Sequence, residues 1–267
     1  MKTILILCVN YNSYHELNSY LKSIDEAAQC VNDCVVKVLV ADTTTDNIQL
    51  ISTAFNYISV EVAVCHENLG YIGGIRRLIT SYGPISCDYT IVSNVDVILP
   101  TDFFVRLLAY PLTEEVGWIA PAIYSESESK DRNPKLISRP SKRHLQLAKQ
   151  LYIHPWIYNL YVTFVYNKRK SEKSVANSSQ IIYGGHGSFM IFTDFKFVAE
   201  AVSQYKAFLF CEENLFAEEL HFRHKTVQYV PEISVNDLDH ASTSKLRGTT
   251  YCRWNRAALS FILNRYY

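Results

Sequence analysis

Residues 3–13 have the sequence TILILCVNYNS, in which a continuous apolar and β-prone run is followed by a short polar stretch. An apolar run without alternation is typical of a strand buried on both faces of a parallel sheet. Either Asn12 or Ser13 can cap a helix, and apolar residues recur at helical spacing from Leu17 to Ala28. This stretch therefore predicts a strand, a turn and a helix, in that order.

The same alternation continues through the first hundred residues. Further strands are expected over residues 35–41, 59–65 and 88–93, with helices around residues 48–55 and after the glycine-bearing loop at 68–74. Strands and helices alternate roughly every 25–30 residues, which predicts βαβ units and a parallel sheet covered by helices on both faces.

Polar side chains follow three of the predicted strands. Asn10, Asp42 and Asp96 each lie just past the carboxyl end of an apolar run. Each residue alone is better explained as a turn former or helix cap. Three such residues at one edge of an α/β sheet favour a ligand site, because open sheets of this kind bind ligands along that edge. A nucleotide-type site is therefore expected in the first half of the chain.

Two common phosphate-binding motifs are absent from the sequence. The first strand is followed by NYNSY, which lacks the glycines of a dinucleotide-binding loop, and no GxxxxGK[ST] sequence occurs. The glycines at positions 70, 73 and 74 follow the third predicted strand and could allow close approach of the backbone to a ligand.

The composition limits the class of protein. The chain has 267 residues, of which 48% are hydrophobic and 19% charged, and this excludes a disordered or coiled-coil chain. Its 26 basic and 26 acidic residues balance, so nothing suggests a nucleic-acid partner. The seven cysteines form no CxxC pair, which favours reduced thiols in a cytosol. The first apolar run is interpreted as a strand rather than a signal peptide.

The segment from residue 130 to residue 173 combines basic and aromatic residues. It carries eleven Lys and Arg residues and only two acids. The basic residues lie on both sides of the aromatic run LYIHPWIYNLYVTFVY at 151–166. That run is too short to span a bilayer comfortably. Basic flanks around Trp and Tyr suit a helix that lies on an anionic membrane surface. A core helix with solvated basic loops is an equally good interpretation.

The second half contains two further motifs with polar residues in apolar surroundings. His186 lies among three glycines in IIYGGHGSFMIF at 181–192. A lone histidine is more often a hydrogen-bonded core residue, but glycines on both sides suggest backbone that leaves room for a bound group. In FLFCEENLFAEEL at 208–220, an expected aromatic strand ends at Glu212 and Glu213. Adjacent glutamates after an apolar run suit a cation or a catalytic base, although acids are also favoured at a helix N-terminus. The chain then continues through VNDLDH at 235–240 to a helix expected over 251–267.

Taken in order, these motifs resemble the family-2 glycosyltransferases of the GT-A fold, in particular a bacterial rhamnosyltransferase-like branch. The resemblance spans nearly the whole chain. It rests on VNYNS at 9–13, Asp42, NLGYIGG at 68–74, SNVDV at 93–97, GGHGSFMIF at 184–192, FLFCEENLFAEEL at 208–220, and His240 with Ser244.

The resemblance implies one α/β domain of the GT-A type, with a Rossmann-like, mostly parallel central sheet flanked by helices and a helical portion on the acceptor or membrane side. Residues 1–100 would form the nucleotide-binding half and residues 101–240 the acceptor half with the insertion at 130–173. Residues 241–267 would form the final helix.

The resemblance also implies roles for individual residues. Glu213 would be the catalytic base that takes the proton of the acceptor hydroxyl, supported by Glu212. Asp96 and His240 would bind Mg²⁺ or Mn²⁺, which neutralises the leaving nucleoside diphosphate. The residues expected to bind the nucleotide-sugar are Asn10, Tyr11, Asn12, Asp42, Asn68, Gly70, Tyr71, Gly74, Asn94, Asp96 and His186.

The sequence departs from the family pattern at three places. Asn94 replaces the first acid of the DxD motif, and the family's Glu-Asp pair is Glu212-Glu213. An Asp and an Arg that often follow in the helix correspond to Leu215 and Glu219. The arginine that would steady the diphosphate is therefore missing there, and the candidates to replace it are Arg76, Arg77 and Arg247.

The expected function is that of an inverting hexosyltransferase, cytosolic and peripheral to the inner face of the cell membrane. It would move a sugar from a dTDP- or UDP-sugar donor to a lipid-linked glycan acceptor in cell-surface polysaccharide biosynthesis. One alternative is an inactive family member that binds glycan or membrane. A sugar-nucleotide pyrophosphorylase is disfavoured because NYNSY is not the glycine-rich basic loop of those enzymes.

Overall fold

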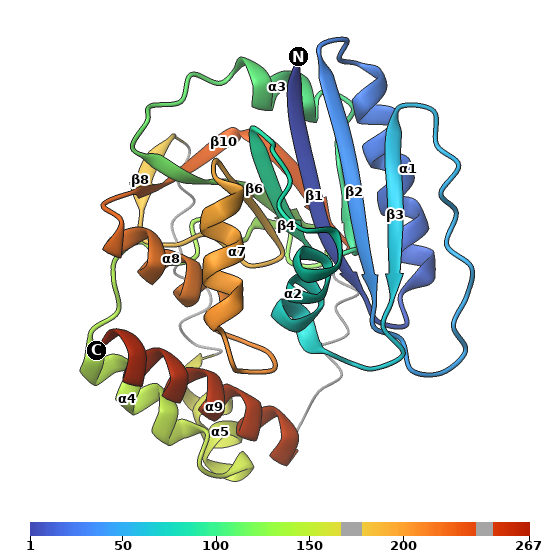
Figure 1. The fold of residues 1–267 in the computed structure, drawn as a ribbon. Helices are drawn as coiled ribbons and strands as arrows, with labels where there is room; N and C mark the ends of the chain where they lie inside the picture. Colours follow the sequence, from blue (N-terminus) through green and yellow to red (C-terminus); the bar gives the residue numbers. More distant parts are fainter. Residues whose placement is uncertain (167–177, 239–247) are drawn as a thin grey trace.

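A computed structural model describes residues 1–166, 178–238 and 248–267. Its centre is a mixed sheet of strand order β3-β2-β1-β4-β9-β6-β10-β5, with helices on both faces (Figure 1). The mostly parallel α/β sheet expected from the sequence is therefore confirmed.

The first half of the sheet is parallel, as the alternation of strands and helices predicted. It consists of β1 (Lys2–Asn10), β2 (Cys34–Asp42), β3 (Ile58–Val64) and β4 (Tyr89–Ser93). In Figure 1 the arrowheads of β1, β2 and β3 point to the same edge of the sheet. Asn10 pairs in register with Asp42, so the ends of β1 and β2 lie side by side at that edge.

The second half of the sheet contains the antiparallel pairs. β9 (Phe189–Phe192) runs antiparallel to its neighbours β4 and β6 (Val116–Ser125), and β10 (Thr226–Asp237) runs parallel to β6. Three short strands complete the sheet by antiparallel pairing, and they are β5 (Val97–Ile98), β7 (Lys130–Asp131) and β8 (Gln180–Ile182).

Alternate residues of the strands pack against helices on opposite faces. Ile4 and Ile6 of β1 belong to a core with α1 (Tyr14–Gln29) and α3 (Phe103–Ala109). Leu5 and Leu7 belong to a second core. The helices of that second core are α2 (Gly70–Tyr82), α7 (Phe195–Gln204), α8 (Glu212–Phe222) and α9 (Gly248–Tyr266), and Leu145 of α4 (Lys142–Leu151) joins them.

The prediction of a helix around residues 48–55 is wrong, because the chain between β2 and β3 is irregular there. Leu50 is 99% exposed, whereas Ile51 is buried against the sheet. A stretch with so few buried apolar side chains has no face whose packing would stabilise a helix.

The strand expected to end before Glu212 is also absent. Phe208–Phe210 form bends, and Phe210 and Cys211 have φ angles of +75° and +59°. Left-handed backbone of this kind is incompatible with a strand, so the glutamates follow a sharp turn.

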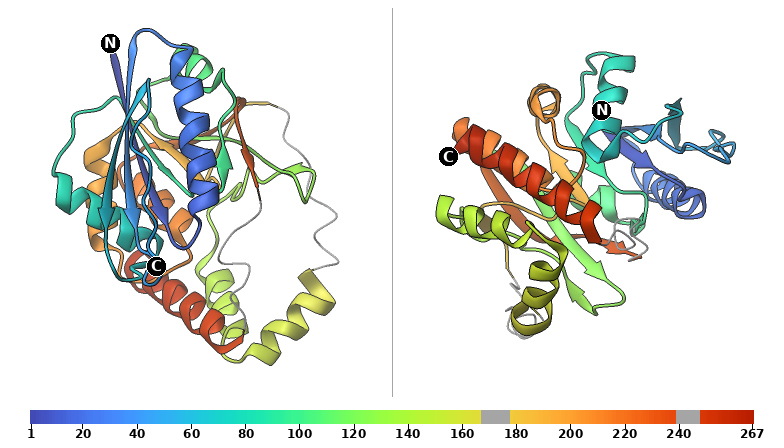
Figure 2. Two further views of the ribbon diagram at one scale, coloured as in Figure 1. Left: turned by 90° about the vertical axis from the view of Figure 1, so that its right-hand side faces the viewer. Right: turned by 90° about the horizontal axis from the view of Figure 1, so that it is seen from below.

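A helical layer lies beyond the strand ends, on the side to which β1, β2 and β3 point (Figure 1). It consists of α4 (Lys142–Leu151), α5 (Pro155–Tyr161) and the π-helical turn η1 (Val162–Tyr166), with α9 beside them. Figure 2 shows α9 running alongside α4. Tyr158 of α5 stacks on Tyr152 and contacts Tyr251 of α9 through both ring and hydroxyl groups.

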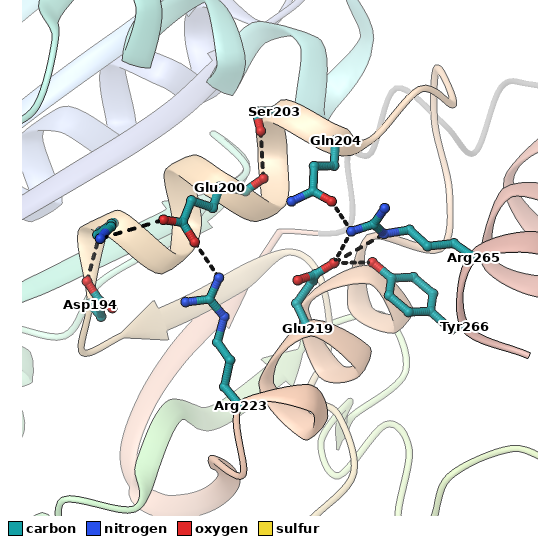
Figure 3. Close-up of polar contacts among 9 residues, drawn as sticks. Asp194, Glu200, Ser203, Gln204, Glu219, Arg223, Arg265 and Tyr266 are labelled. Carbon is teal, nitrogen blue, oxygen red and sulfur yellow. Dashed lines mark hydrogen bonds and ion pairs between the residues drawn. The ribbon is translucent and has the colours of Figure 1, made fainter.

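Buried acids of α8 hold this layer to the sheet. Glu219 accepts hydrogen bonds from the Arg265 guanidinium at 2.9 Å and the Tyr266 hydroxyl at 2.7 Å (Figure 3). Figure 3 also shows Arg265 contacting Gln204 of α7. The fully buried Glu218 accepts two hydrogen bonds from Arg139, which comes from the basic segment.

The basic segment thus has a partly structural role. Lys130, Arg132, Arg139 and Lys142 are bonded to Glu128, Asp237, Glu218 and the backbone oxygen of Tyr267, respectively. Within the described ranges, none of the helices is long and apolar enough to cross a membrane.

Candidate active site

A cavity of about 500 Å³ lies at the carboxyl edge of the parallel strands. It brings together nine of the residues predicted from the sequence, and they are Tyr11, Asn68, Gly70, Tyr71, Asn94, Asp96, His186, Glu212 and Glu213. The other lining residues are Val9, Ser13, Thr43, Val95, Lys135, Gly187, Ser188, Phe208, Leu209, Phe210 and Trp254.

Asn10 and Asp42 lie behind the cavity wall and are both fully buried. The Asp42 carboxylate accepts hydrogen bonds from Asn10 Nδ2 at 3.0 Å, from the Tyr14 hydroxyl at 2.8 Å and from the backbone N–H of Thr44 at 3.2 Å. These bonds join the turn after β1 to the turn after β2. In this structure the two residues therefore hold in place the segments that carry Tyr11, Ser13 and Thr43.

Asn12 is exposed and does not line the cavity. Its φ of +56° places it in the left-handed region, which asparagine tolerates better than most residues. Its backbone N–H donates to Thr44 Oγ1 at 3.0 Å, which again joins the two turns.

The start of α2 requires the glycine at position 70. Gly70 has φ +69°, and a Cβ atom there would lie 2.1 Å from the carbonyl oxygen of Phe208. Asn68 Oδ1 accepts from the Gly70 N–H at 3.0 Å, and the Tyr71 hydroxyl donates to the Gly187 carbonyl at 3.1 Å. Gly74 does not line the cavity, and its Cβ would lie 2.7 Å from Val9, so it allows α2 to pack on β1.

Asp96 is 6% exposed, and its Oδ1 atom has no hydrogen-bond partner within the described structure. Burial raises the pKa of this carboxyl to about 6, and the nearby Asp237 adds to the rise. Leu238 of the segment after β10 donates its N–H to the Asp96 carbonyl, so the end of β10 is tied to this acid.

A buried, unpaired carboxylate oxygen fits a divalent cation. Mg²⁺ in particular is bound by one or two carboxylates together with substrate phosphates. The described residues contain no group of three or more acids, histidines or cysteines arranged to hold a metal. Asp96 could therefore supply one ligand, with the remainder from a bound diphosphate. His240, the second predicted ligand, lies outside the described residues, as do Ser244 and Arg247.

The two glutamates of the site differ in environment. Glu212 is 9% exposed, and its Oε1 accepts from the Phe210 N–H at 2.8 Å. Burial, with a contribution from Glu213, raises the pKa of Glu212 to about 8, which favours its protonated form more than in an ordinary glutamate. Glu213 is partly exposed and lines the cavity next to Gly187, where a Cβ atom would lie 3.7 Å from the Glu213 carboxyl carbon. Of this pair, Glu213 is the side chain more exposed to a ligand in the cavity.

His186 is held by its own loop. The backbone N–H of Ser188 donates to His186 Nδ1 at 3.2 Å, which places the proton of the neutral ring on Nε2. The His186 N–H donates to Asn133 Oδ1 at 2.8 Å.

Sequence reasoning missed the contributions of Lys135 and Trp254. Gly187 and Ser188 could have been found, because they lie within the GGHGS motif. Lys135 was counted within the basic segment without a site role, and Trp254 lies in the expected final helix. Neither has a local pattern that indicates a ligand site.

Comparison with known proteins shows the fold of this chain. No protein-family model matches the sequence, and curated proteins give no match. GalNAc-T7, solved with UDP, GalNAc and Mn²⁺, matches over 91% of this chain with a TM-score of 0.53 and 9% identity. The mannosyltransferase PcManGT from Pyrobaculum calidifontis, solved with GDP-Man and Mn²⁺, matches over 90% with a TM-score of 0.49 and 12% identity.

This chain spans 44% of the GalNAc-T7 chain and 59% of the PcManGT chain. At such low identity the similarity carries the fold alone. The chain therefore has the GT-A fold that the sequence motifs predicted.

Proposed function

We propose that this protein is a glycosyltransferase that moves a sugar from a nucleotide-sugar donor to a hydroxyl group of an acceptor. The observation that carries the proposal is the cavity, which brings Asn94 and Asp96 together with Glu212 and Glu213 at the carboxyl edge of a GT-A sheet. The structural neighbours GalNAc-T7 and PcManGT, which were solved with UDP or GDP-Man and with Mn²⁺, support the same class of donor.

The donor would lie along the ends of β1, β2 and β4. Tyr11 and the Asn68–Tyr71 turn line this part of the cavity, while Asn10 and Asp42 hold the two turns in register. Asp96, and His240 from the segment outside the described residues, are the proposed ligands for Mg²⁺ or Mn²⁺. When bound, the cation supplies positive charge that stabilises the departing nucleoside diphosphate.

We further propose that transfer inverts the anomeric centre, as in the family-2, rhamnosyltransferase-like enzymes that the motifs resemble. The acceptor oxygen attacks the anomeric carbon, the bond to the diphosphate oxygen breaks, and Glu213 takes the acceptor proton. Glu212 is suited to a supporting role, because burial raises its pKa and so favours its neutral form next to Glu213. A neutral neighbour avoids the repulsion that two adjacent carboxylates would have.

A lipid-linked glycan acceptor at the cytosolic face of the membrane is the proposed acceptor class. The support is a set of exposed apolar side chains carried by the helical layer, namely Leu147, Ile153, Trp156, Leu160 and Phe164. Basic residues accompany them in α4, where Arg143 is exposed. We call these five residues the apolar patch. Apolar side chains with basic neighbours suit binding to an anionic bilayer.

The test is a thermal-shift panel with UDP, dTDP, GDP and CMP, each with and without Mn²⁺. A ligand that binds only the folded state raises the melting temperature by mass action, so a metal-dependent shift with one nucleotide is expected. Transfer from the matching nucleotide-sugar is then measured for the wild type and for Glu213→Gln.

Glu213→Gln is expected to lower transfer by about 10²–10⁴-fold, the range for loss of a general base, with an unchanged nucleotide shift. Glu114→Gln is the matched control, since Glu114 is exposed and distant from the cavity lining. Nucleotide binding without transfer by the wild type would instead support an inactive binding protein. Absence of any nucleotide shift would contradict the proposed donor site.

A further inference from the structure

Lys135 brings a positive charge to a cavity that otherwise carries acids. The cavity is lined by three carboxyl groups, those of Asp96, Glu212 and Glu213, and Lys135 is the one Lys or Arg among its described lining residues. A nucleoside diphosphate that entered this cavity would bring further negative charge. Its binding therefore needs a positively charged partner on the protein in addition to a metal ion.

Of the three arginines considered from the sequence, Arg247 lies outside the described residues, and the other two do not meet this need. Arg76 donates through its guanidinium to the carbonyl oxygens of Val202 and Tyr205, where it holds the end of α7. Arg77 is exposed and does not line the cavity. Both arginines lie on α2, and the Arg76 guanidinium is already hydrogen-bonded to the protein.

The Lys135 backbone is anchored on both sides to the loop that carries His186. On one side, Asn133 Nδ2 donates to the Pro121 carbonyl at 2.7 Å and Asn133 Oδ1 accepts from the His186 N–H at 2.8 Å. On the other side, the Leu136 N–H donates to the Gly184 carbonyl at 2.9 Å, and its carbonyl accepts from the Gly184 N–H at 3.0 Å. Lys135 is thus held at the cavity by backbone geometry.

The Lys135 amine is also available. It differs from Lys130, Arg132, Arg139 and Lys142 of the same segment, which have acidic or carbonyl partners. Lys135 is exposed, and the described part of the chain offers it no hydrogen-bond or ion-pair partner. A lysine held at a cavity without a protein partner has the chemistry of a phosphate-binding residue.

We propose that Lys135 binds the diphosphate group of the nucleotide-sugar donor and so replaces the arginine that the family pattern has in α8. This inference rests on the proposed function, because it assigns a residue to the donor site. The ammonium group stabilises the negative charge that grows on the diphosphate as the sugar leaves, which is electrostatic stabilisation of the transition state.

The experiment measures binding of UDP, dTDP, GDP and CDP with Mn²⁺ by isothermal titration calorimetry. The proteins are the wild type, Lys135→Met, Lys135→Arg and the control Lys22→Met, whose lysine is exposed on α1 and away from the cavity lining. Loss of one charged hydrogen bond predicts affinity about 10- to 150-fold weaker in Lys135→Met. Lys135→Arg is expected to keep most of the affinity, and Lys22→Met all of it.

Unchanged diphosphate affinity in Lys135→Met would overturn the proposal. A higher KM for the acceptor with unchanged diphosphate affinity would also overturn it, because Lys135 would then act on the acceptor. Equal losses in the Met and Arg variants would also overturn it, because positive charge would then not be the cause. If the wild type binds none of the four diphosphates, the proposed function itself fails. Melting temperatures of all four proteins, expected to agree, show that each is folded.

Discussion

Phe208 and Trp254 lie with their ring centroids 4.6 Å apart at the cavity, and they join the turn before the glutamates to helix α9. A second ring pair, Phe210 with Tyr251, lies 5.2 Å apart and makes the same connection. The turn before Glu212 contains Phe210 and Cys211, whose backbones are in the left-handed region. Residues in such sparsely populated backbone regions persist only where their surroundings hold them, and α9 provides that support for Glu212 and Glu213.

Replacing Trp254 by Ala is therefore expected to disturb the glutamate turn. The change removes an aromatic contact and part of the cavity wall, so the free energy of unfolding should fall by about 1–3 kcal/mol. Transfer activity should fall by about tenfold or more, because small displacements of catalytic groups are costly. Urea denaturation and transfer assays measure both effects.

Trp156→Ala is the matched control for that change, since Trp156 is 62% exposed on α5. Its unfolding free energy and its activity with a soluble acceptor should match the wild type. Full activity in Trp254→Ala would show that α9 does not support the turn.

Replacing Asp96 by Asn should separate stability from metal binding. The unpaired, buried Oδ1 is unfavourable in the metal-free protein. The melting temperature of Asp96→Asn should therefore equal or exceed that of the wild type, and the gain in free energy of unfolding should be at most about 1–3 kcal/mol. The additional thermal shift that Mn²⁺ gives with a nucleoside diphosphate should disappear. Asp33→Asn, at an exposed aspartate, should keep that shift. A retained Mn²⁺-dependent shift in Asp96→Asn would remove Asp96 from the metal site.

The raised pKa of Glu212 predicts a pH dependence of stability. Its pKa is about 8 in the folded protein against an ordinary value of 4.5, so the folded state binds this proton more tightly. The stability that this group contributes is full below pH 4.5 and is lost as the pH rises through about 8. Glu212→Gln lacks this loss, so its stability relative to the wild type should increase from pH 5 to pH 8.

The slope of that increase is at most about 1.4 kcal/mol per pH unit. Urea denaturation at pH 5, 6, 7 and 8 measures it, with Glu114→Gln as the control whose difference from the wild type should stay flat. A flat difference for Glu212→Gln as well would mean that Glu212 is ionised in the folded protein.

Removing Arg139 should destabilise the protein through Glu218. Glu218 is fully buried and pairs with Arg139 at 2.9 Å. Arg139→Met leaves this acid without its partner, which costs several kcal/mol for a fully buried pair. Because the Arg139 side chain is 38% exposed, the expected loss is smaller, about 1–3 kcal/mol.

Denaturant unfolding of Arg139→Met and Arg143→Met measures this loss. Arg143 is the matched control, because it is exposed and the described residues offer it no acidic partner. Equal stabilities of the two variants would show that the buried pair contributes nothing.

We expect the apolar patch to bind anionic vesicles. Replacing Trp156, Leu160 and Phe164 together by Ser removes apolar area that is exposed in the structure, so vesicle binding should weaken by about tenfold or more. Replacing Lys168, Arg169 and Lys170 by Glu should weaken it further at low salt, since attraction to anionic lipid adds about 1 kcal/mol per basic residue. Co-sedimentation with phosphatidylglycerol vesicles measures both.

Triple replacement of the exposed apolar residues Leu50, Tyr57 and Val64 by Ser is the control for the patch. These residues lie at the β3 side of the sheet, so vesicle binding should be unchanged. Wild-type binding by the patch variant would exclude the patch as a membrane-binding surface.

Much of the sheet was predictable because its information is local. The apolar run at 3–9 became β1, and the runs at 35–41, 59–65 and 88–93 became β2, β3 and β4. A β-prone apolar run favours a strand in a buried sheet wherever it lies in the chain. The helix expected at 48–55 failed for the complementary reason, since its helical character depended on packing that the fold does not supply there.

The sequence by itself determined the parallel half of the sheet and the edge at which Asn94 and Asp96 lie. These features follow from strand burial and from the rule that the carboxyl ends of parallel strands share one edge. Only the tertiary structure decided that Asp42 lies behind the cavity wall and that Lys135 and Trp254 line it. Such placements depend on contacts between segments far apart in the chain, and no local periodicity encodes which side chain meets which.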